Sequence, residues 1–223
     1  MQLNFEKLPH IEDFPRQGIL QIFLACENDC LYGFDFNSAD EQTDQNGFRV
    51  IYHKDIITDT SLLISDDDIP CDSFSSDEYD FPLKKEFILC AEEPDKCPAT
   101  PDDYRFSNAL VSSYSEIMGQ EVSNYWNIDG YDTLYDRCPE SVAFIGGYPR
   151  FTQSDPREDC PSLEGFDRVL FELGSLQGEE ITSWGGHDFD IIWGDVGTGV
   201  FLIPAEKLRA CDFSKVVYNY DCG

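Results

Sequence analysis

Residues 168–173 read RVLFEL and residues 199–203 read GVFLI. Both runs are short, are rich in β-branched and aromatic residues, and are bounded by turn-forming residues, which is typical of buried β-strands. Toward the N-terminus, GILQIFLA at 18–25 and FRVIYH at 48–53 have the same composition. We therefore expect buried strands in both halves of the chain. Two further runs predict strands, DIIW at 190–193 and, between exposed loops, EFILCA at 86–91.

From Asp102 onward the apolar spacing changes to that of a helix. Apolar residues recur every three or four positions, as in the buried stripe of an amphipathic helix: Phe106, Leu110, Tyr114, Ile117 and Met118. We expect Asp102 or Asp103 to cap the N-terminus of this helix and Gly119 to end it. PAEKLRA at 204–210 predicts a short helix with proline in its first turn.

The two ends of the chain are similar to each other. The segments that correspond are GILQIFLA, YGFDF (32–36) and FRVIYHKD (48–55) in the first half, and RVLFEL, WGDVG (193–197) and FSKVVYNYD (213–221) in the second. Each set consists of a strand, a turn with an aromatic residue and glycine, and a strand ending in aspartate, which indicates a duplicated β unit. We predict an α+β fold: a large, mostly antiparallel or mixed β-sheet built from two similar β-rich halves, or two facing sheets, with one main amphipathic helix and short helices packed on it. A ligand groove is expected where the glycine turns meet.

Acidic residues dominate the charge of the chain. Asp and Glu number 44 against 15 Lys and Arg, for a net charge of −29. Residues 59–103 form an acidic, loop-rich insert, and the carboxylates predicted to contact a partner are Asp66, Asp67, Asp68, Asp77, Glu78, Glu92, Glu93, Asp102 and Asp103. Such a surface repels nucleic acid and anionic membranes, which are bound mainly through lysine and arginine. It suits a basic protein partner, and the alternative is that the acidity only keeps the protein in solution.

The sequence also predicts a cytosolic, unanchored protein. The first residues, MQLNFEKLPHIEDFP, are interrupted by charge and proline, unlike a secretory signal, and the apolar runs are far shorter than the roughly 20 residues that span a bilayer. The nine cysteines are odd in number and widely spread, so we expect mostly reduced thiols. The pairs Cys26/Cys30 and Cys90/Cys97 lack the spacing of a zinc site, and we expect no metal or other cofactor.

One group of residues has the composition of a catalytic site. His187, Asp188, Asp190 and Asp195 lie within nine positions, and imidazole with carboxylates can hold a divalent cation or act as a general base. The alternative is that these aspartates are turn residues beside glycine. The motifs of zinc proteases, serine hydrolases, P-loop proteins and dinucleotide-binding proteins are absent from the chain. A binding protein is therefore favoured over a metal-dependent or acid–base enzyme.

The stretch GGYPRFTQSDPR, residues 146–157, is the motif loop. Gly146 and Gly147 allow a positive φ or a close backbone approach, and the two prolines stiffen the chain. Directional polar groups come from Arg150, Gln153, Asp155 and Arg157. Two interpretations follow. The loop is either an internal clamp, in which the arginines pair with carboxylates of the chain, or the rim of a site for a small anion or a peptide terminus.

The motif loop and three other stretches resemble the YwqG-like proteins, a bacterial family also known as DUF1963. These stretches are LPHIEDFPRQGILQIFL, WGDVGTGVFLI and DFSKVVYNYDC. The resemblance covers nearly the whole chain. The resemblance implies a single α+β domain over residues 1–223 and no known catalytic residues. Members of such families are often encoded near secreted toxins, which implies an immunity protein that neutralises a basic toxin. A structural interaction module is a further alternative.

Overall fold

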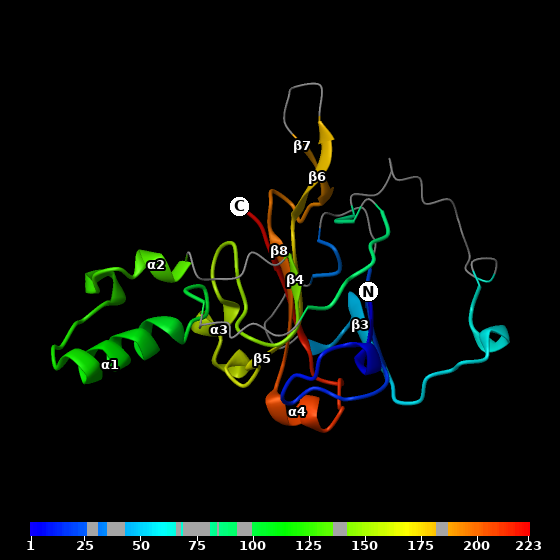
Figure 1. Ribbon diagram of the computed structural model, residues 1–223, viewed down its shortest axis with the longest axis horizontal. Helices are drawn as coiled ribbons and strands as arrows, with labels where there is room; N and C mark the ends of the chain where they lie inside the picture. Colours follow the sequence, from blue (N-terminus) through cyan, green and yellow to red (C-terminus); the bar gives the residue numbers. More distant parts are fainter. Residues whose placement is uncertain are drawn as a thin grey trace.

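The computed structural model describes residues 1–25, 31–34, 43–65, 68, 81–83, 85–92, 100–135, 142–181 and 187–223. Within these residues the strands form three antiparallel sheets, shown in Figure 1. The three-stranded sheet contains β1 (Gln2–Asn4), β2 (Ile19–Leu24) and β3 (Phe48–His53) in that order. The four-stranded sheet has the order β4 (Ala143–Phe144), β5 (Arg168–Gly174), β8 (Thr198–Ile203) and β9 (Val217–Asp221). The third is the hairpin of β6 (Leu176–Ile181) and β7 (His187–Ile191).

Helices are few and mostly short, so the α+β class is confirmed. The α-helices are α1 (Phe106–Met118), α2 (Asp132–Tyr135), α3 (Pro156–Asp159) and α4 (Ala205–Arg209). Short 3₁₀ helices are η1 (Phe5–Lys7), η3 (Thr60–Leu62), η5 (Tyr125–Asn127) and η6 (Pro161–Leu163). None of the helices in these described segments has both the length and the apolar character needed to cross a membrane.

The two larger sheets differ in how much of their surface is covered. On β2 and β3 every second residue is buried (Leu20 and Ile22, Phe48 and Val50), so these strands bury one face. Strands β5 and β8 are buried at nearly every position, because Phe151 of the motif loop, Leu163 of η6 and Phe166 cover the second face of the four-stranded sheet. The near-continuous apolar runs of RVLFEL and GVFLI follow from this double coverage.

The main core lies between the three-stranded and four-stranded sheets. Phe48 of β3 packs against Phe201 of β8 and Tyr218 of β9 at ring-centroid distances of 5.8 and 5.5 Å. The rings of Phe201 and Tyr218 stack at 4.6 Å. Apolar residues of both sheets therefore share one cluster, which places the two β-rich halves face to face.

The described parts of the two glycine turns meet through their aromatic residues. Tyr32 lies at 5.7 Å from Trp193 and at 4.9 Å from Tyr220, between ring centroids. Tyr32 and Trp193 are both almost completely buried. Aromatic rings packed edge to face therefore lie at the position at which the sequence predicted a ligand groove, because both turns contribute large apolar side chains to the core.

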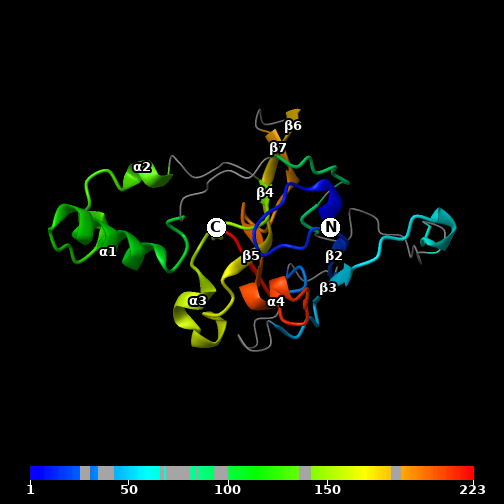
Figure 2. The ribbon, with the colours of Figure 1, turned by 60° about the horizontal axis from the view of Figure 1, so that its bottom comes forward.

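Helix α1 begins at Phe106 and ends at Gly119, whose φ of 65° gives the left-handed C-cap that the sequence predicts. Its N-cap is Arg105 and not an aspartate. The predicted stripe is buried only at Phe106; Ile117 is 80% exposed and Met118 is 61% exposed. The reason is visible in Figures 1 and 2, where α1 extends away from the sheets.

Two expected strands differ in the structure. Residues 85–92, which include EFILCA, form no strand, and Ile88 is 93% exposed. Instead, Leu83 forms an isolated bridge with Ile191, and the carbonyl of Pro82 accepts a hydrogen bond from the amide of Ile192. The predicted strand 190–193 overlaps only the end of β7, which stops at Ile191.

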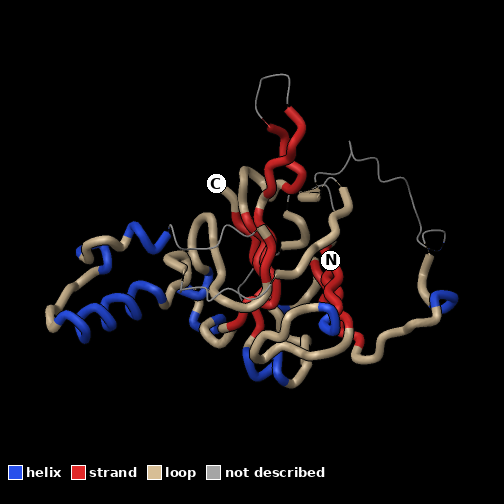
Figure 3. The backbone as a smooth tube through the Cα atoms, viewed as in Figure 1, coloured by secondary structure: helices blue, strands red, loops and turns tan. Residues whose placement is uncertain are grey.

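Two segments of the described chain extend away from the sheets, as Figure 3 shows. We call residues 106–135, which contain α1, η5 and α2, the helical arm. Residues 54–65, which follow β3 and contain η3, are the extended arm. The two arms lie on opposite sides of the sheets in both ribbon views.

Candidate functional site

The motif loop covers the outer face of the four-stranded sheet. Gly146 and Gly147 have φ of 72° and 71°, the left-handed conformation that favours glycine, and the amide of Gly146 donates to the carbonyl of Val169 at 2.8 Å. Phe151 then packs with Leu163 on the buried side chains of the sheet. The motif loop therefore covers the second, smaller apolar cluster.

Arg150 fastens the loop to β5. Its backbone amide donates to one carboxylate oxygen of Glu172 at 2.9 Å, and its Nε donates to the other at 3.1 Å. The guanidinium also lies over the ring of Phe144, 4.7 Å from the centroid. Glu172 is completely buried, and burial raises the pKa of its carboxyl group to about 8, although the hydrogen bonds and charge of Arg150 partly offset this effect.

Two more carboxyl groups, those of Asp102 and Asp221, interact with the motif loop. Burial raises the pKa of Asp102, as does the negative charge of Asp221, while Arg150 lowers it. Burial also raises the pKa of Asp221, although hydrogen bonds from the loop act against this shift. One of them comes from the amide of Gln153, at 2.9 Å. The side-chain amide of Gln153 donates to the carbonyl of Cys222 at 2.6 Å, so the loop is also fastened to the end of β9.

Arg157 fixes the base of the helical arm. Its side chain is completely buried; Nε donates to Asp155 at 2.8 Å, one terminal nitrogen donates to Asp103 at 2.9 Å, and the other donates to the carbonyl of Phe166 at 3.0 Å. Asp103 also accepts hydrogen bonds from the amide and Nε of Arg105 at 2.9 and 2.8 Å. Burial by itself would raise the pKa of Asp103, but the hydrogen bonds of Arg105 and the charge of Arg157 lower it.

The geometry of the motif loop favours the internal clamp over an anion site, because both arginines bind carboxylates of the same chain. Asp155 caps α3 by accepting from the amide of Arg157 at 3.0 Å, and its other oxygen accepts from the amide of Tyr104 at 3.0 Å. The central role of Glu172 was not predicted from the sequence. A glutamate inside the apolar run RVLFEL is the signal that could have revealed it, since an unpaired charge is rarely buried in a strand.

The residues of the proposed catalytic cluster are distributed along the β6–β7 hairpin and the turn after it. Asp188 accepts a hydrogen bond from the amide of Phe189 at 2.9 Å, and Asp190 forms a 2.7 Å ion pair with Lys85. His187 begins β7, and the backbone carbonyl of Asp195 accepts from the amide of Gly223. Across the described ranges, no three His, Cys, Asp or Glu residues lie close enough to hold a metal ion. A catalytic role for the cluster stays a prediction.

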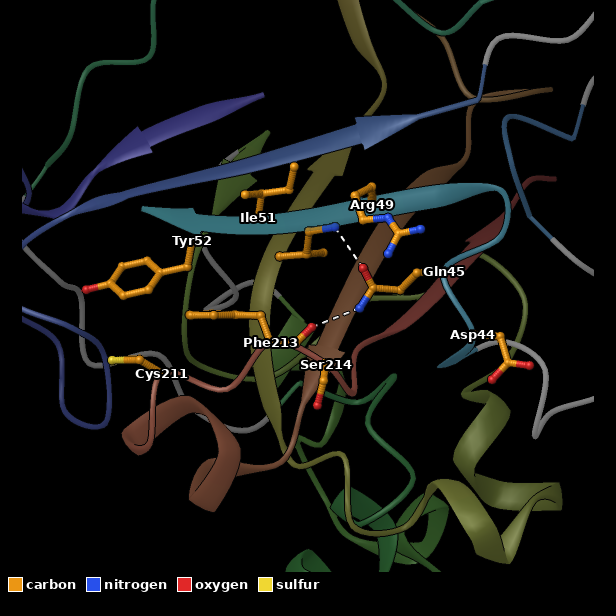
Figure 4. A pocket seen from close by; sticks show the side chains of 9 residues that line it. Asp44, Gln45, Arg49, Ile51, Tyr52, Cys211, Phe213 and Ser214 are labelled. Carbon is orange, nitrogen blue, oxygen red and sulfur yellow. Dashed lines mark hydrogen bonds between the residues drawn. The ribbon is translucent and has the colours of Figure 1, made fainter. Parts of the chain in front are cut away.

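A pocket of about 390 Å³ lies between β3 and the segment after α4, as Figure 4 shows. Gln45 joins its two walls: the side-chain amide donates to the carbonyl of Phe213 at 2.8 Å, and the side-chain oxygen accepts from the amide of Val50 at 2.8 Å. Burial, followed by the adjacent thiol of Cys211, raises the pKa of Tyr52 in the same wall. This pocket was not predicted, because its two walls come from distant parts of the chain: Gln45 and Phe213 are 168 residues apart.

Disulfide bonds are absent among the cysteines of the described ranges. The cysteines that the structure describes, Cys90, Cys160, Cys211 and Cys222, are free thiols. The close pair Cys26/Cys30 lies outside the described residues, as does Cys97.

The carboxylates predicted to contact a partner separate into three groups. Asp68 and Glu92 are exposed. Asp102 is partly buried and Asp103 is only 2% exposed, so Asp103 belongs to the clamp and is out of reach of a partner. The remaining residues lie outside the described part of the chain: Asp66, Asp67, Asp77, Glu78 and Glu93.

Exposed apolar side chains accompany the acidic residues of the insert. On the extended arm Leu62 is 69% exposed and Ile64 is 78% exposed. Asp59, which lies between β3 and these two residues in the sequence, caps η3. Its carboxylate accepts hydrogen bonds from the amide and the hydroxyl of Ser61 at 3.0 and 2.7 Å. The segment 85–92 repeats this combination, with Ile88 exposed among glutamates. Both segments therefore offer apolar contact area within a negative field.

Comparison with known families covers almost the whole chain. The family model described as a domain of unknown function, DUF1963, matches residues 1–222. None of the curated proteins matches this sequence. The similarity includes the motif loop, both larger sheets and the two arms, so the clamp described above lies inside the matched region. The chain belongs to the DUF1963 family.

Proposed function

We propose that this protein binds a positively charged protein and that the acidic insert, residues 59–103, supplies much of the contact. The observation that supports this proposal is the extended arm, which lies away from the sheets in Figure 1 and carries exposed Leu62, Leu63 and Ile64 together with exposed Asp55 and Asp59. Apolar side chains grouped in this way are typical of contact surfaces, because exposing them to water is unfavourable.

The charge of the chain defines the class of partner. With a net charge of −29, the protein attracts cationic surfaces over several ångströms and repels nucleic acid and anionic lipid. Charge of this kind speeds association and excludes wrong partners, while buried apolar contacts hold the complex together. A cationic protein with apolar side chains in its contact surface satisfies both requirements.

An immunity protein is the specific form of this function that we favour. In this role the protein would act in the cytoplasm and neutralise a basic secreted toxin by covering its cationic surface. The proposal requires no catalytic group of its own, and it is consistent with a motif loop whose arginines are engaged within the chain.

Affinity purification from the source cell tests the proposal. The tagged protein is captured at low salt and eluted with a salt gradient, next to a variant in which the exposed Asp59 and Asp68 are changed to asparagine and the exposed Glu92 is changed to glutamine. We expect a basic protein in equimolar amount, released at lower salt from the variant because three attractive charges are lost.

A variant with the same change in charge elsewhere is the matched control. Glu158, Asp159 and Glu164 are exposed residues on and after α3, and replacing them with the corresponding amides should leave the elution position close to that of the unmodified protein. Capture of no basic protein at low salt, or equal effects of the two variants, would contradict the proposed role of the insert.

A further inference from the structure

The apolar stripe of α1 continues beyond the part of the helix that the protein covers. Phe106 is buried, Leu110 and Tyr114 are partly buried, and Ile117 and Met118 are 80% and 61% exposed. These positions follow the spacing of one helix face. The outer half of α1 thus presents an apolar face that no described residue covers.

The surroundings of this face are acidic. Between positions 106 and 135 the sequence contains no Lys, Arg or His and contains four acidic residues: Glu116, Glu121, Asp129 and Asp132. All four are exposed. An apolar surface bordered only by negative charge is complementary to an apolar surface bordered by lysine or arginine.

The helical arm is also held in place before any partner binds. Within the arm, Phe106 contacts Tyr125 at a ring-centroid distance of 5.9 Å, and Tyr125 contacts Trp126 at 4.2 Å. At its base, Asp103 and Tyr104 are bonded to Arg157 and Asp155. A surface that is already ordered loses little conformational entropy on binding, which favours affinity.

We propose that the outer half of α1 is a docking surface for a basic amphipathic helix, with Ile117 and Met118 as the apolar anchors. This inference rests on the proposed function and identifies a second contact, separate from the acidic insert. Charge decides between the possible occupants, since a second copy of this chain and an anionic membrane both carry the same sign of charge as the helical arm.

Two synthetic peptides with the same positive charge test the docking surface in the full-length protein. One is a lysine–leucine peptide that forms an amphipathic helix, and the other is oligolysine. We expect the amphipathic peptide to bind at least about tenfold more tightly, measured by fluorescence anisotropy at low salt. Hydrogen exchange should slow in residues 106–118 when this peptide is bound.

Replacing both Ile117 and Met118 with serine should reduce the affinity for the amphipathic peptide to that for oligolysine. Because both side chains are exposed, the variant should keep its fold, which circular dichroism verifies. The matched control replaces Phe23 and Val196, which are 51% and 50% exposed and lie outside both arms, with serine and should leave the affinity for the amphipathic peptide unchanged.

The outcomes of these binding experiments separate failure of the docking surface from failure of the proposed function. If both peptides bind equally and the Ile117/Met118 variant behaves like the unmodified protein, the docking surface is refuted while attraction of positive charge, and with it the proposed function, survives. If neither peptide binds at low salt, both proposals fail. Slow exchange in residues 106–118 that depends on protein concentration without peptide would identify a second copy as the occupant and overturn the inference.

Discussion

Arg157 illustrates how this acidic chain places one buried cation between two carboxylates. Its guanidinium bonds Asp103 and Asp155, and none of the three side chains is more than 1% exposed. A buried ion pair adds little stability relative to apolar residues, but removal of one partner leaves uncompensated charge in the interior. The network therefore determines where the base of the helical arm lies.

Replacement of Arg157 by alanine should lower the free energy of unfolding by roughly 3–5 kcal/mol, because both aspartates would remain buried without their cation. Urea denaturation followed by circular dichroism measures this change. Arg209 is the control, since its side chain is 57% exposed and its partner Asp13 keeps a second ion pair with Arg168. An Arg157→Ala midpoint as high as that of Arg209→Ala would contradict the role of the buried network.

Glu172 should make stability depend on pH. Its pKa of about 8 in the folded protein lies above the value of an unfolded glutamate. The stabilisation is thus complete below about pH 4.5 and is lost as the pH rises to 8, since the folded state then has to bury a charge. Relative to Glu172→Gln, the unmodified protein should lose on the order of 3 kcal/mol between pH 5 and 8.

Urea denaturation at several pH values measures this difference. Glu179→Gln, a change at an exposed position of β6, is the control and should keep the pH dependence of the unmodified protein. If Glu172→Gln and the unmodified protein show the same pH dependence, the carboxyl group of Glu172 does not titrate as proposed.

At the scale of elements, β8 is positioned by close packing as well as by hydrogen bonds. A Cβ atom added to Gly199 would lie 2.6 Å from the ring of Trp193, which is itself buried. Gly199→Ala should lower the free energy of unfolding by about 1–3 kcal/mol, because a packed core tolerates additional atoms poorly. Thermal unfolding compares the Gly199→Ala variant with Gly165→Ala, because a Cβ atom added at Gly165 meets no neighbour within 4 Å. Similar thermal midpoints for the two variants would contradict the packing argument.

The elements that local patterns specify were predicted well. Strands β2, β3, β5 and β8 and helix α1 coincide with the expected ranges, since the alternation or helical spacing of apolar residues is a local property. The run EFILCA has the same composition but forms no strand. A strand needs an edge with which to pair, and pairing with a distant segment is not encoded in the run itself.

The candidate site was predicted less completely than the fold. The polar residues of the motif loop were identified, yet their partners Glu172, Asp221 and Cys222 lie far away in sequence. Contacts between distant residues cannot be read from one sequence without coupling between positions. Exposure of Ile117 and Met118 was likewise not predicted, because a helical stripe gives the direction of an apolar face and not whether a neighbour covers it.

For the whole molecule, the net charge of −29 should oppose folding through self-repulsion. Raising sodium chloride from about 0.02 M to about 0.3 M should therefore raise the thermal midpoint, because added ions screen like charges more than about 10 Å apart. Differential scanning calorimetry measures the change. A midpoint that falls with salt would indicate that the ion pairs contribute more to stability than the repulsion removes.

The association rate with the co-purified basic protein tests the central claim most directly. Stopped-flow measurements from about 0.02 M to about 0.3 M salt should show a rate that falls at least about tenfold, because screening removes the long-range attraction. The variant with Asp59 and Asp68 changed to asparagine and Glu92 changed to glutamine should associate more slowly and show a weaker dependence on salt. An association rate that does not change with salt would contradict the claim that this protein recognises a positively charged partner through its acidic surface.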